Sequence, residues 1–194
     1  GDDNYYQITP DDIIIEYDGQ GNDRIFTDVD YTLRSGSYVE TLSTTSNAGT
    51  AALNLTGNEL ANIIIGNAGV NLLDGGAGSD TIYGGGGLDY FYFSSALGAS
   101  NVDTLGDFSS VDDILMIDSR VFTGGGLAAG FVDASAFLSA AGATAATTAA
   151  HRFIYNSTTG DLYYDADGAG GAAAVKFANL GAGAQLENYD LFVI

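Results

Sequence analysis

A run of nine-residue units, rich in glycine and each with an aspartate or asparagine at its sixth place, occupies the middle of the chain. The units are GNAGVNLLD (66–74), GGAGSDTIY (75–83) and GGGGLDYFY (84–92). Two of them follow the pattern Gly-Gly-x-Gly-x-Asp-x-U-x, in which U is a large apolar residue. A period this strict predicts a solenoid in which every unit contributes one turn and one short strand.

Each unit divides into a turn and a strand for physical reasons. Glycine accepts positive φ, which residues with side chains resist, so the first six residues form a tight turn with uncovered carbonyls. The last three residues form a strand whose U side chain points inward at the strand period of two. The expected inward residues are Leu73, Ile82 and Phe91, preceded by Ile64 in the unit GNELANIII (57–65).

The turns alternate between the two edges of the predicted roll, so each turn stacks on the one eighteen residues away. Asn62 is then expected above Asp80 on one edge, and Asn71 above Asp89 on the other. Carboxylate and carbonyl oxygens are the ligands that a hard cation of calcium's size prefers. We therefore expect Ca²⁺ between stacked turns at each edge, and the best two full ligands are Asp80 and Asp89.

The turn glycines belong to the expected site because they leave carbonyl oxygens uncovered for the cation. They are Gly66, Gly75, Gly76, Gly78, Gly84, Gly85 and Gly87. Two units depart from the pattern, since asparagine replaces aspartate at Asn62 and Asn71, and Asn58 and Asn67 stand where the second glycine is expected. These two turns are predicted to bind calcium weakly or to be held by side-chain amides.

The chain resembles the carboxy-terminal region of the repeats-in-toxin (RTX), or hemolysin-type, calcium-binding proteins of Gram-negative bacteria. The resemblance rests on the in-frame units and extends to earlier segments. GDDNYYQI at the start resembles half a unit with Asp3 at the ligand position, and DGQGNDRIF (18–26) a further unit with Asp23 as ligand and Ile25 inward. Residues 29–62 are similar to the long spacer coils of large RTX proteins.

The segment after the repeats, NVDTLGDFSSVDDILMID (101–118), resembles the one that closes the roll in serralysin-type metalloproteases. In those proteins, aspartates in a D-x-I-x-D-F segment complete the last calcium sites. The resemblance implies Asp103 and Asp107 as ligands here, with Leu105 in place of isoleucine, and Asp113 as a further contributor.

The expected fold is all-β: a calcium-binding parallel β-roll (a β-solenoid) followed by a mostly antiparallel β capping lobe. The expected divisions are irregular roll or spacer coils (1–56), the regular nonapeptide roll (57–93), and a carboxy-terminal cap with the secretion-signal region (94–194). Strands outside the repeats are expected near residues 4–8, 12–17, 23–29, 52–56 and 172–180.

Three further elements are expected in the capping lobe. HRFIYN (151–156) and DLYYDA (161–166) predict a hairpin around STTG. DASAFLSAAG (133–142) predicts a short helix capped by Asp133 or Ser135. The final LFVI is expected to dock as a strand, because a loose terminus has to be tied down.

Composition narrows the partners. The 25 acidic residues against five basic ones give a net charge of −20, which opposes compaction by self-repulsion. This charge argues against nucleic acid and anionic membranes, which need the opposite sign, and favours divalent cations. Hydrophobic residues make up 46% of the chain, so it is not a disordered acidic tail. It has no cysteine, and no apolar run approaches the ~20 residues of a membrane span.

The motifs of the common hydrolases are missing from this sequence, so we expect no catalytic role for it. There is neither the HExxH of zinc proteases nor the GxSxG of lipases. The single histidine, His151, is expected to be structural. Asp165-Ala166-Asp167-Gly168 resembles the start of an EF-hand loop but lacks its remaining ligands, so it is interpreted as a tight turn.

The resemblance implies a protein exported by a type I secretion apparatus, which folds on extracellular calcium outside a Gram-negative cell or on its surface. Two alternatives remain. One is a calcium-dependent adhesin or surface-layer assembly module that contacts other surface proteins or glycans. The other is the non-catalytic end of a secreted protease, lipase or epimerase. Calcium-dependent assembly or glycan binding would favour the first, and a catalytic motif upstream the second.

Overall fold

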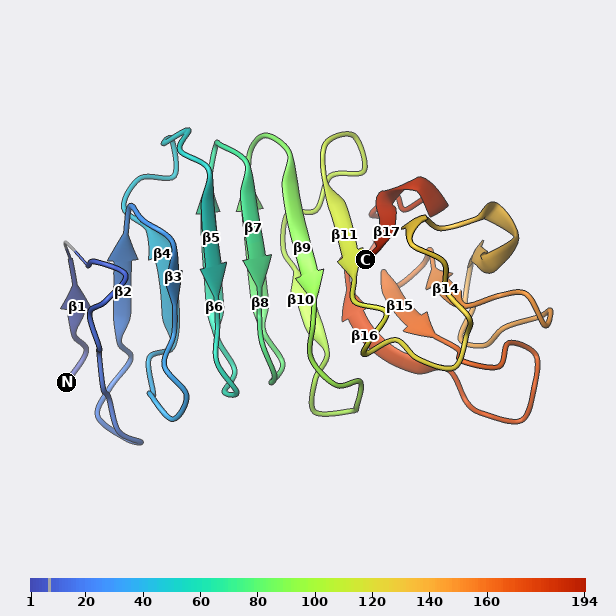
Figure 1. Cartoon of the computed structure of the whole chain (residues 1–194), viewed down its shortest axis with the longest axis horizontal. Coiled ribbons are helices and arrows are strands. Elements are labelled where there is room, and N and C mark those ends of the chain that lie inside the picture. Colours follow the sequence, from blue (N-terminus) through green and yellow to red (C-terminus); the bar gives the residue numbers. More distant parts are fainter. Residues whose placement is uncertain (7) are drawn as a thin grey trace.

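Two β-sheets run side by side along the length of the protein. The structure, a computed structural model, describes residues 1–6 and 8–194. The first sheet has ten strands in the order β1-β2-β4-β6-β8-β10-β16-β15-β14-β13, and the second has seven in the order β12-β17-β11-β9-β7-β5-β3. Figure 1 shows the coils stacked one after another from the N-terminal end to the lobe that holds the C-terminus.

The strands are short in both sheets. The first sheet contains β1 (Asn4–Tyr5), β2 (Arg24–Thr27), β4 (Thr41–Thr44), β6 (Ile63–Asn67), β8 (Thr81–Gly85), β10 (Asp103–Leu105), β13 (Phe137–Ala140), β14 (Phe153–Asn156), β15 (Asp161–Tyr164) and β16 (Val175–Asn179). The second contains β3 (Tyr31–Thr32), β5 (Leu53–Thr56), β7 (Asn71–Asp74), β9 (Asp89–Phe93), β11 (Ile114–Ile117), β12 (Gly130–Phe131) and β17 (Leu191–Val193). Single turns of 3-10 helix occur at η1 (Ala134–Ala136) and η2 (Asn188–Asp190).

Consecutive strands of the repeats lie in opposite sheets, so one coil of the roll uses two units. β6 and β8 are parallel neighbours in the first sheet, and β7 and β9 in the second. The parallel ladders continue on both sides of the nonapeptides, through β4 and β10 in one sheet and β5 and β11 in the other. The parallel β-roll expected from the repeats is confirmed, and it extends from the spacer segment past residue 93.

The inward side chains stack into two apolar ladders. Those of the first sheet, each at most 1% exposed, are Ile25, Leu42, Ile64, Ile82 and Leu105. Those of the second sheet, each 0% exposed, are Leu55, Leu73, Phe91, Leu115 and Leu191. The strand registers place each of these residues beside the next one in its ladder. Burial of such a side chain contributes ~1.5–3 kcal/mol, so the U positions of the units and the residues that continue their ladders stabilise the roll together.

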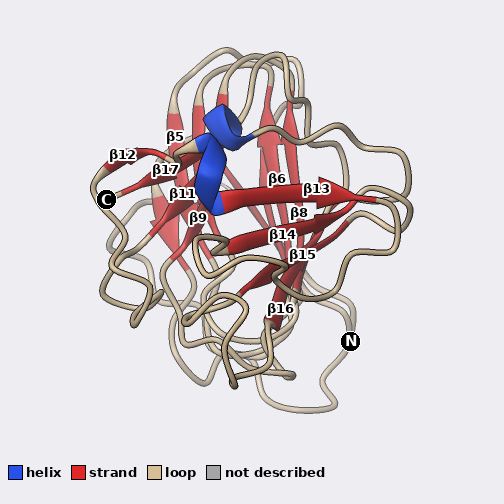
Figure 2. Ribbon diagram, turned by 90° about the vertical axis from the view of Figure 1, so that its right-hand side faces the viewer, coloured by secondary structure: helices blue, strands red, loops and turns tan. Residues whose placement is uncertain are grey.

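The capping lobe continues both sheets. β16 pairs in parallel with β10, and the expected hairpin is confirmed because β14 and β15 pair antiparallel around the predicted turn. The expected strand at 172–180 is also confirmed as β16. Figure 2 looks onto this end of the molecule, where β13 to β16 lie in front of the roll strands.

The pairings among the strands of the lobe are mostly antiparallel, as expected, with one exception. β15 pairs antiparallel with β16, and β12 with β17, but β13 pairs in parallel with β14. β16 and β17 also pair in parallel with the roll strands β10 and β11, so each prolongs one sheet of the roll. The final strand is docked as expected, since β17 lies between β11 and β12.

Two local expectations differ from the structure. Residues 12–17 form no strand, although Glu16 is buried as period two requires. The predicted helix at 133–142 is only the single turn η1, after which the chain enters β13. Asp133 is its N-cap, because its side chain accepts from the Ser135 N–H. No helix among the described residues is long and apolar enough to cross a lipid bilayer.

Candidate calcium-binding turns

A column of polar side chains follows one edge of the roll, one residue per coil. Its members stand just before β1, β2, β4, β6, β8 and at the start of β10, and they are Asp3, Asp23, Glu40, Asn62, Asp80 and Asp103. The main-chain N–H of Asn62 donates to Oδ1 of Asp80 at 2.7 Å, and the N–H of Asp80 donates to Oδ1 of Asp103 at 3.0 Å. The expected stacking of Asn62 on Asp80 is therefore confirmed, and Asp103 extends the column by one coil.

The other edge carries a matching column. The N–H of Asn71 donates to Oδ1 of Asp89 at 2.8 Å, and the N–H of Asp89 donates to Oδ1 of Asp113 at 3.0 Å. Asn71 and Asp89 are also partners in the register of β7 and β9. The structure thus separates two of the expected ligands in the closing segment, with Asp103 beside Asp80 on one edge and Asp113 beside Asp89 on the other.

Each repeat aspartate keeps one oxygen without a partner. Asp80 and Asp89 are both 1% exposed, and in each the Oδ2 atom is buried with no hydrogen-bond partner among the described residues. A buried carboxylate oxygen left in this state is costly, because burial removes its water without replacing it. A cation seated against Oδ2 would remove that cost, so this donor set fits calcium.

Glycine makes room for these oxygens. A Cβ atom on Gly75 would lie 2.3 Å from Oδ2 of Asp80, and one on Gly84 would lie 2.5 Å from Oδ2 of Asp89. Neither glycine has positive φ. Glycine is therefore required at these positions because a Cβ would not fit beside the carboxylate, not because of the backbone conformation. Gly66 is the equivalent residue beside Asn71, where a Cβ would lie 2.3 Å from Oδ1.

The remaining turn glycines combine a left-handed backbone with close stacking. Gly76 and Gly85 have φ of 85° and 99°, and Gly78 and Gly87 have φ of 115° and 92°. A Cβ on Gly76 would also lie 2.3 Å from a carbonyl oxygen of the turn eighteen residues earlier, that of Asn58. Stacked turns therefore present main-chain carbonyls at close range, beside the partnerless carboxylate oxygens.

The asparagine turns are held by their own amides, as expected. Oδ1 of Asn62 accepts from the Asn58 N–H at 2.9 Å, while its Nδ2 donates to the Val39 carbonyl at 2.9 Å. Oδ1 of Asn71 likewise accepts from the Asn67 N–H at 2.8 Å. An amide supplies both a donor and an acceptor, so it closes the turn without a cation.

Burial shifts the acids at both edges toward the protonated form. Burial removes water and raises the pKa of Asp89 to about 7 and that of Asp113 to about 6. The N–H groups that donate to these carboxylates lower the pKa, but by less. Burial also raises the pKa of Asp80 and of Asp103, and each column has further carboxylates close by. Acids in this condition release their protons more readily when a cation is bound, which is the usual behaviour of metal ligands.

The other expected ligands are placed differently. Both oxygens of Asp107 accept main-chain N–H groups, from Gly84 at 2.8 Å and from Gly85 at 2.9 Å. Asp107 therefore braces the turn that contains Asp89. Asp113 also accepts from the Ser109 N–H at 2.8 Å, which leaves it no oxygen free of hydrogen bonds.

The remaining singled-out residues take structural roles. Oδ2 of Asp167 accepts from the N–H groups of Gly171 and Ala172, which makes the segment the tight turn that was expected. Nδ1 of His151 lies 3.3 Å from the Thr147 N–H. Both contacts are local.

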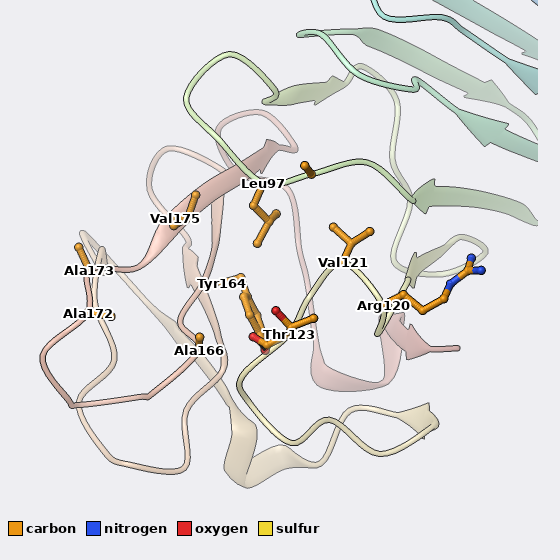
Figure 3. A pocket seen from close by; sticks show the side chains of 10 residues that line it. Leu97, Arg120, Val121, Thr123, Tyr164, Ala166, Ala172, Ala173 and Val175 are labelled. Carbon is orange, nitrogen blue, oxygen red and sulfur yellow. Dashed lines mark hydrogen bonds between the residues drawn. The ribbon is translucent and has the colours of Figure 1, made fainter.

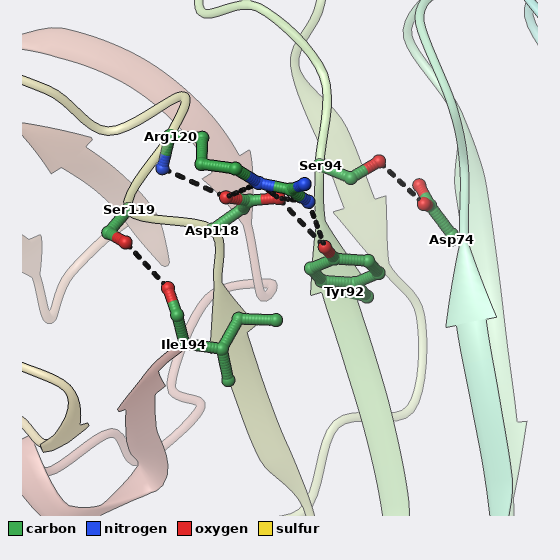
Figure 4. A network of polar contacts seen from close by, with 7 residues as sticks. All are labelled: Asp74, Tyr92, Ser94, Asp118, Ser119, Arg120 and Ile194. Atoms are coloured by element: carbon green, nitrogen blue, oxygen red, sulfur yellow. Dashed lines mark hydrogen bonds and ion pairs between the residues drawn. The ribbon is translucent and has the colours of Figure 1, made fainter.

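A polar network ties the closing segment to the roll. Figure 4 shows Arg120 paired with Asp118, whose Oδ2 also accepts from the Tyr92 hydroxyl at 2.8 Å. Beside it, Ser119 Oγ donates to the Ile194 carbonyl at 2.7 Å. This network fixes the last residue of the chain against the end of β11, apart from the calcium turns.

A pocket of about 510 Å³ lies near that network, lined by small or aliphatic side chains and Tyr164 (Figure 3). The charged residue in its lining, Arg120, is already paired with Asp118. None of the turn aspartates lines the pocket, so it has no part in the candidate calcium site.

Glu40 is a member of the first column that the sequence analysis missed. Its Oε2 accepts from the Asp23 N–H at 2.7 Å, as the turn aspartates do for their neighbours. The signal was present, because Glu40-Thr41-Leu42 repeats the acid-x-U spacing of the nonapeptides before a buried Leu42. The turn before Glu40 lacks the glycine pattern, so the nonapeptide pattern did not identify Glu40 as an equivalent of the turn aspartates.

Stacked glycine turns with inward-facing strands and buried, partnerless carboxylate oxygens define a calcium-binding parallel β-roll. The family described as RTX calcium-binding nonapeptide repeat (4 copies) matches residues 56–91. These residues are therefore RTX-type repeats, and they bind Ca²⁺. No curated protein matches the chain.

Proposed function

We propose that this calcium-binding RTX module is a calcium-triggered folding unit of a larger secreted or surface protein. The observation that carries the proposal is the pair of buried carboxylates, Asp80 and Asp89, each with an Oδ2 atom that has no partner among the described residues. Such groups penalise the folded state until a cation binds them. Binding free energy then becomes folding free energy.

The net charge of −20 supports a gated rather than a permanent fold. Without calcium, the carboxylates repel one another and oppose compaction. Extracellular calcium modules bind with Kd ~10⁻⁴–10⁻³ M, so a cytosol poor in calcium leaves the chain loose, and the calcium outside the cell folds it. We assign the module no catalytic role.

We further propose that the carboxy-terminal region carries the target of a type I secretion apparatus. Export precedes folding in this scheme, so the final residues serve first as the export target and later as part of the fold. In the unfolded chain they are open to the exporter, and in the folded protein they form β17 between β11 and β12. A fusion of residues 94–194 to a reporter, expressed with and without such an exporter, tests this role.

The folding proposal is tested by adding calcium to EDTA-treated protein while far-UV circular dichroism is recorded. Magnesium at the same concentration is the control, because it prefers a tighter octahedral shell that keeps several waters. A cooperative gain of β signal with calcium alone is the expected result. A protein already folded in EDTA, with the same spectrum after calcium is added, would refute calcium-triggered folding.

A further inference from the structure

Three acidic side chains meet at the amino-terminal end of the roll, outside the matched repeats. One oxygen from each of Asp3, Glu16 and Asp23 lies within 4.8 Å of the others. Asp3 precedes β1, Asp23 precedes β2, and Glu16 lies on the loop between these strands. A nonapeptide turn has no counterpart of Glu16, so this cluster differs in composition from the repeat sites.

One member of the cluster has an oxygen with no partner. Asp23 is 1% exposed, and its Oδ1 accepts from the Asp3 N–H at 2.8 Å. Its Oδ2 is buried and has no hydrogen-bond partner among the described residues. This is the condition found at Asp80 and Asp89, although Asp23 lies far from them in the sequence.

The fold holds Glu16 inward against its preference for water. Its side chain is 5% exposed, and the Tyr5 hydroxyl donates to Oε1. Its N–H donates to Ser37 Oγ at 3.2 Å, and its carbonyl accepts from the Tyr38 N–H at 3.0 Å. These contacts fix the loop so that a charged group points at two other carboxylates.

Positive charge near the cluster is limited. Among the described residues, the ion pair that reaches it joins the Gly1 amino group to Oδ2 of Asp3 at 3.9 Å, on an exposed side chain. The guanidinium of the neighbouring Arg24 lies over the Phe26 ring and donates to Ser43. The buried carboxylates of Glu16 and Asp23 therefore have no ionic partner within the described chain.

We propose that Asp3, Glu16 and Asp23 bind one calcium ion in addition to those of the repeats. Three carboxylates with no nitrogen or sulfur donor suit a hard divalent cation, and their charge favours its binding. The ion clamps the loop between β1 and β2 onto the first coil. This site stands apart from the repeat sites and can fail without them.

Calorimetric calcium titration of the full chain tests the site. Asp3→Asn and Glu16→Gln are each expected to bind one ion fewer than the wild type, or to bind one ion at least tenfold more weakly. Asp11→Asn is the matched control, because it removes the same charge from an exposed position on the same loop. Asp3 is itself exposed, so its substitution leaves a folded protein even if Glu16→Gln does not.

Cleavage by chymotrypsin gives an independent readout, because Tyr17 is 68% exposed on this loop. At saturating calcium, cleavage after Tyr17 is expected to be as slow in Asp11→Asn as in the wild type, and faster in Asp3→Asn. An Asp3→Asn protein with the wild-type ion count and the wild-type protection would overturn this site and leave the repeat sites standing. A wild type that binds no calcium would overturn both proposals.

Discussion

The main-chain N–H of Asn62 donates to Oδ1 of Asp80 at 2.7 Å, so stacking gives one carboxylate oxygen a partner and leaves Oδ2 for a cation. The same relation joins Asn71 and Asp89 on the opposite edge. In the folded roll this hydrogen bond fixes one oxygen of the carboxylate. The other oxygen is thereby oriented for calcium by the coil that precedes it in the sequence.

Asp89→Asn is expected to raise the calcium concentration at the folding midpoint by on the order of tenfold or more, because it removes a charged ligand. The measurement is calcium titration followed by circular dichroism. Asp112→Asn is the control, since it removes one charge from an exposed neighbour of Asp113. Equal midpoints for the two variants would remove Asp89 from the calcium site.

Asn62→Asp is expected to make the fold more dependent on calcium. The variant loses the amide that donates to the Val39 carbonyl and adds a carboxylate beside Asp80. At limiting calcium its folded fraction should fall, since the lost hydrogen bond costs ~1–3 kcal/mol, and excess calcium should restore it.

The control is Asn188→Asp, which loses an amide bond to the Val132 carbonyl in the cap. Far-UV circular dichroism at limiting and at saturating calcium separates the two effects. A loss for Asn62→Asp that calcium does not reverse would show that this turn cannot take a cation.

Gly75→Ala is expected to destabilise the calcium-bound protein by ~1–3 kcal/mol, because its Cβ would meet Oδ2 of Asp80 at 2.3 Å. Gly98→Ala is the matched control, since a Cβ there has nothing within 4 Å. Its effect should stay within ~0.5 kcal/mol. Thermal unfolding in calcium is the measurement, and similar losses for both variants would contradict the role of Gly75 as space for the ligand.

The calcium-free fold is expected to lose stability as the pH rises from about 4 to about 7. The pKa of Asp89 is raised to about 7 by burial, whereas an unfolded aspartate titrates near ~3.9. Between these values the folded state holds more protons than the unfolded state, so its unfolding free energy falls with pH.

Saturating calcium should reverse that trend, because ligands must be deprotonated to bind the ion. The far-UV β signal at pH 5 and pH 8, in EDTA and in calcium, checks both signs. A β signal in EDTA that is larger at pH 8 than at pH 5 would contradict the proposed burial of unpaired acids.

Removal of residues 191–194 is expected to produce aggregation in calcium. The deletion takes away β17 and exposes an edge of β11 together with the buried Leu115. Exposed strand edges of this kind pair with other chains. Size-exclusion chromatography with light scattering is the measurement, and a monomeric truncated protein would show that the last strand is dispensable to the cap.

The sequence predicted the repeats well because their period leaves little choice. Once the glycine turns fix two units per coil, the inward ladder through Leu73 and Phe91 follows from counting residues. The pairs across stacked turns, such as Asn71 on Asp89, follow from the same count. Local chemistry and overall topology coincide in this part of the chain.

The rest escaped prediction because its contacts are not periodic. Residues 12–17 alternate correctly, with Ile13 and Ile15 exposed and Glu16 buried, but no neighbouring strand pairs with them in the structure. The partners of Glu16 and the parallel pairings of the cap depend on loops of irregular length. Pairing between segments distant in sequence is not encoded in a local pattern, so only the structure could supply it.

The hydrogen bonds at the ligand positions all run the same way along the roll, since an N–H of the earlier coil donates to a carboxylate of the later one. The two ends of the solenoid are therefore not equivalent. Loss of a coil at the amino-terminal end frees an acceptor, which water or a cation can serve. Loss of one at the opposite end frees a donor, which water can serve but no cation can, so a cation can take the place of a missing coil at the amino-terminal end and not at the other.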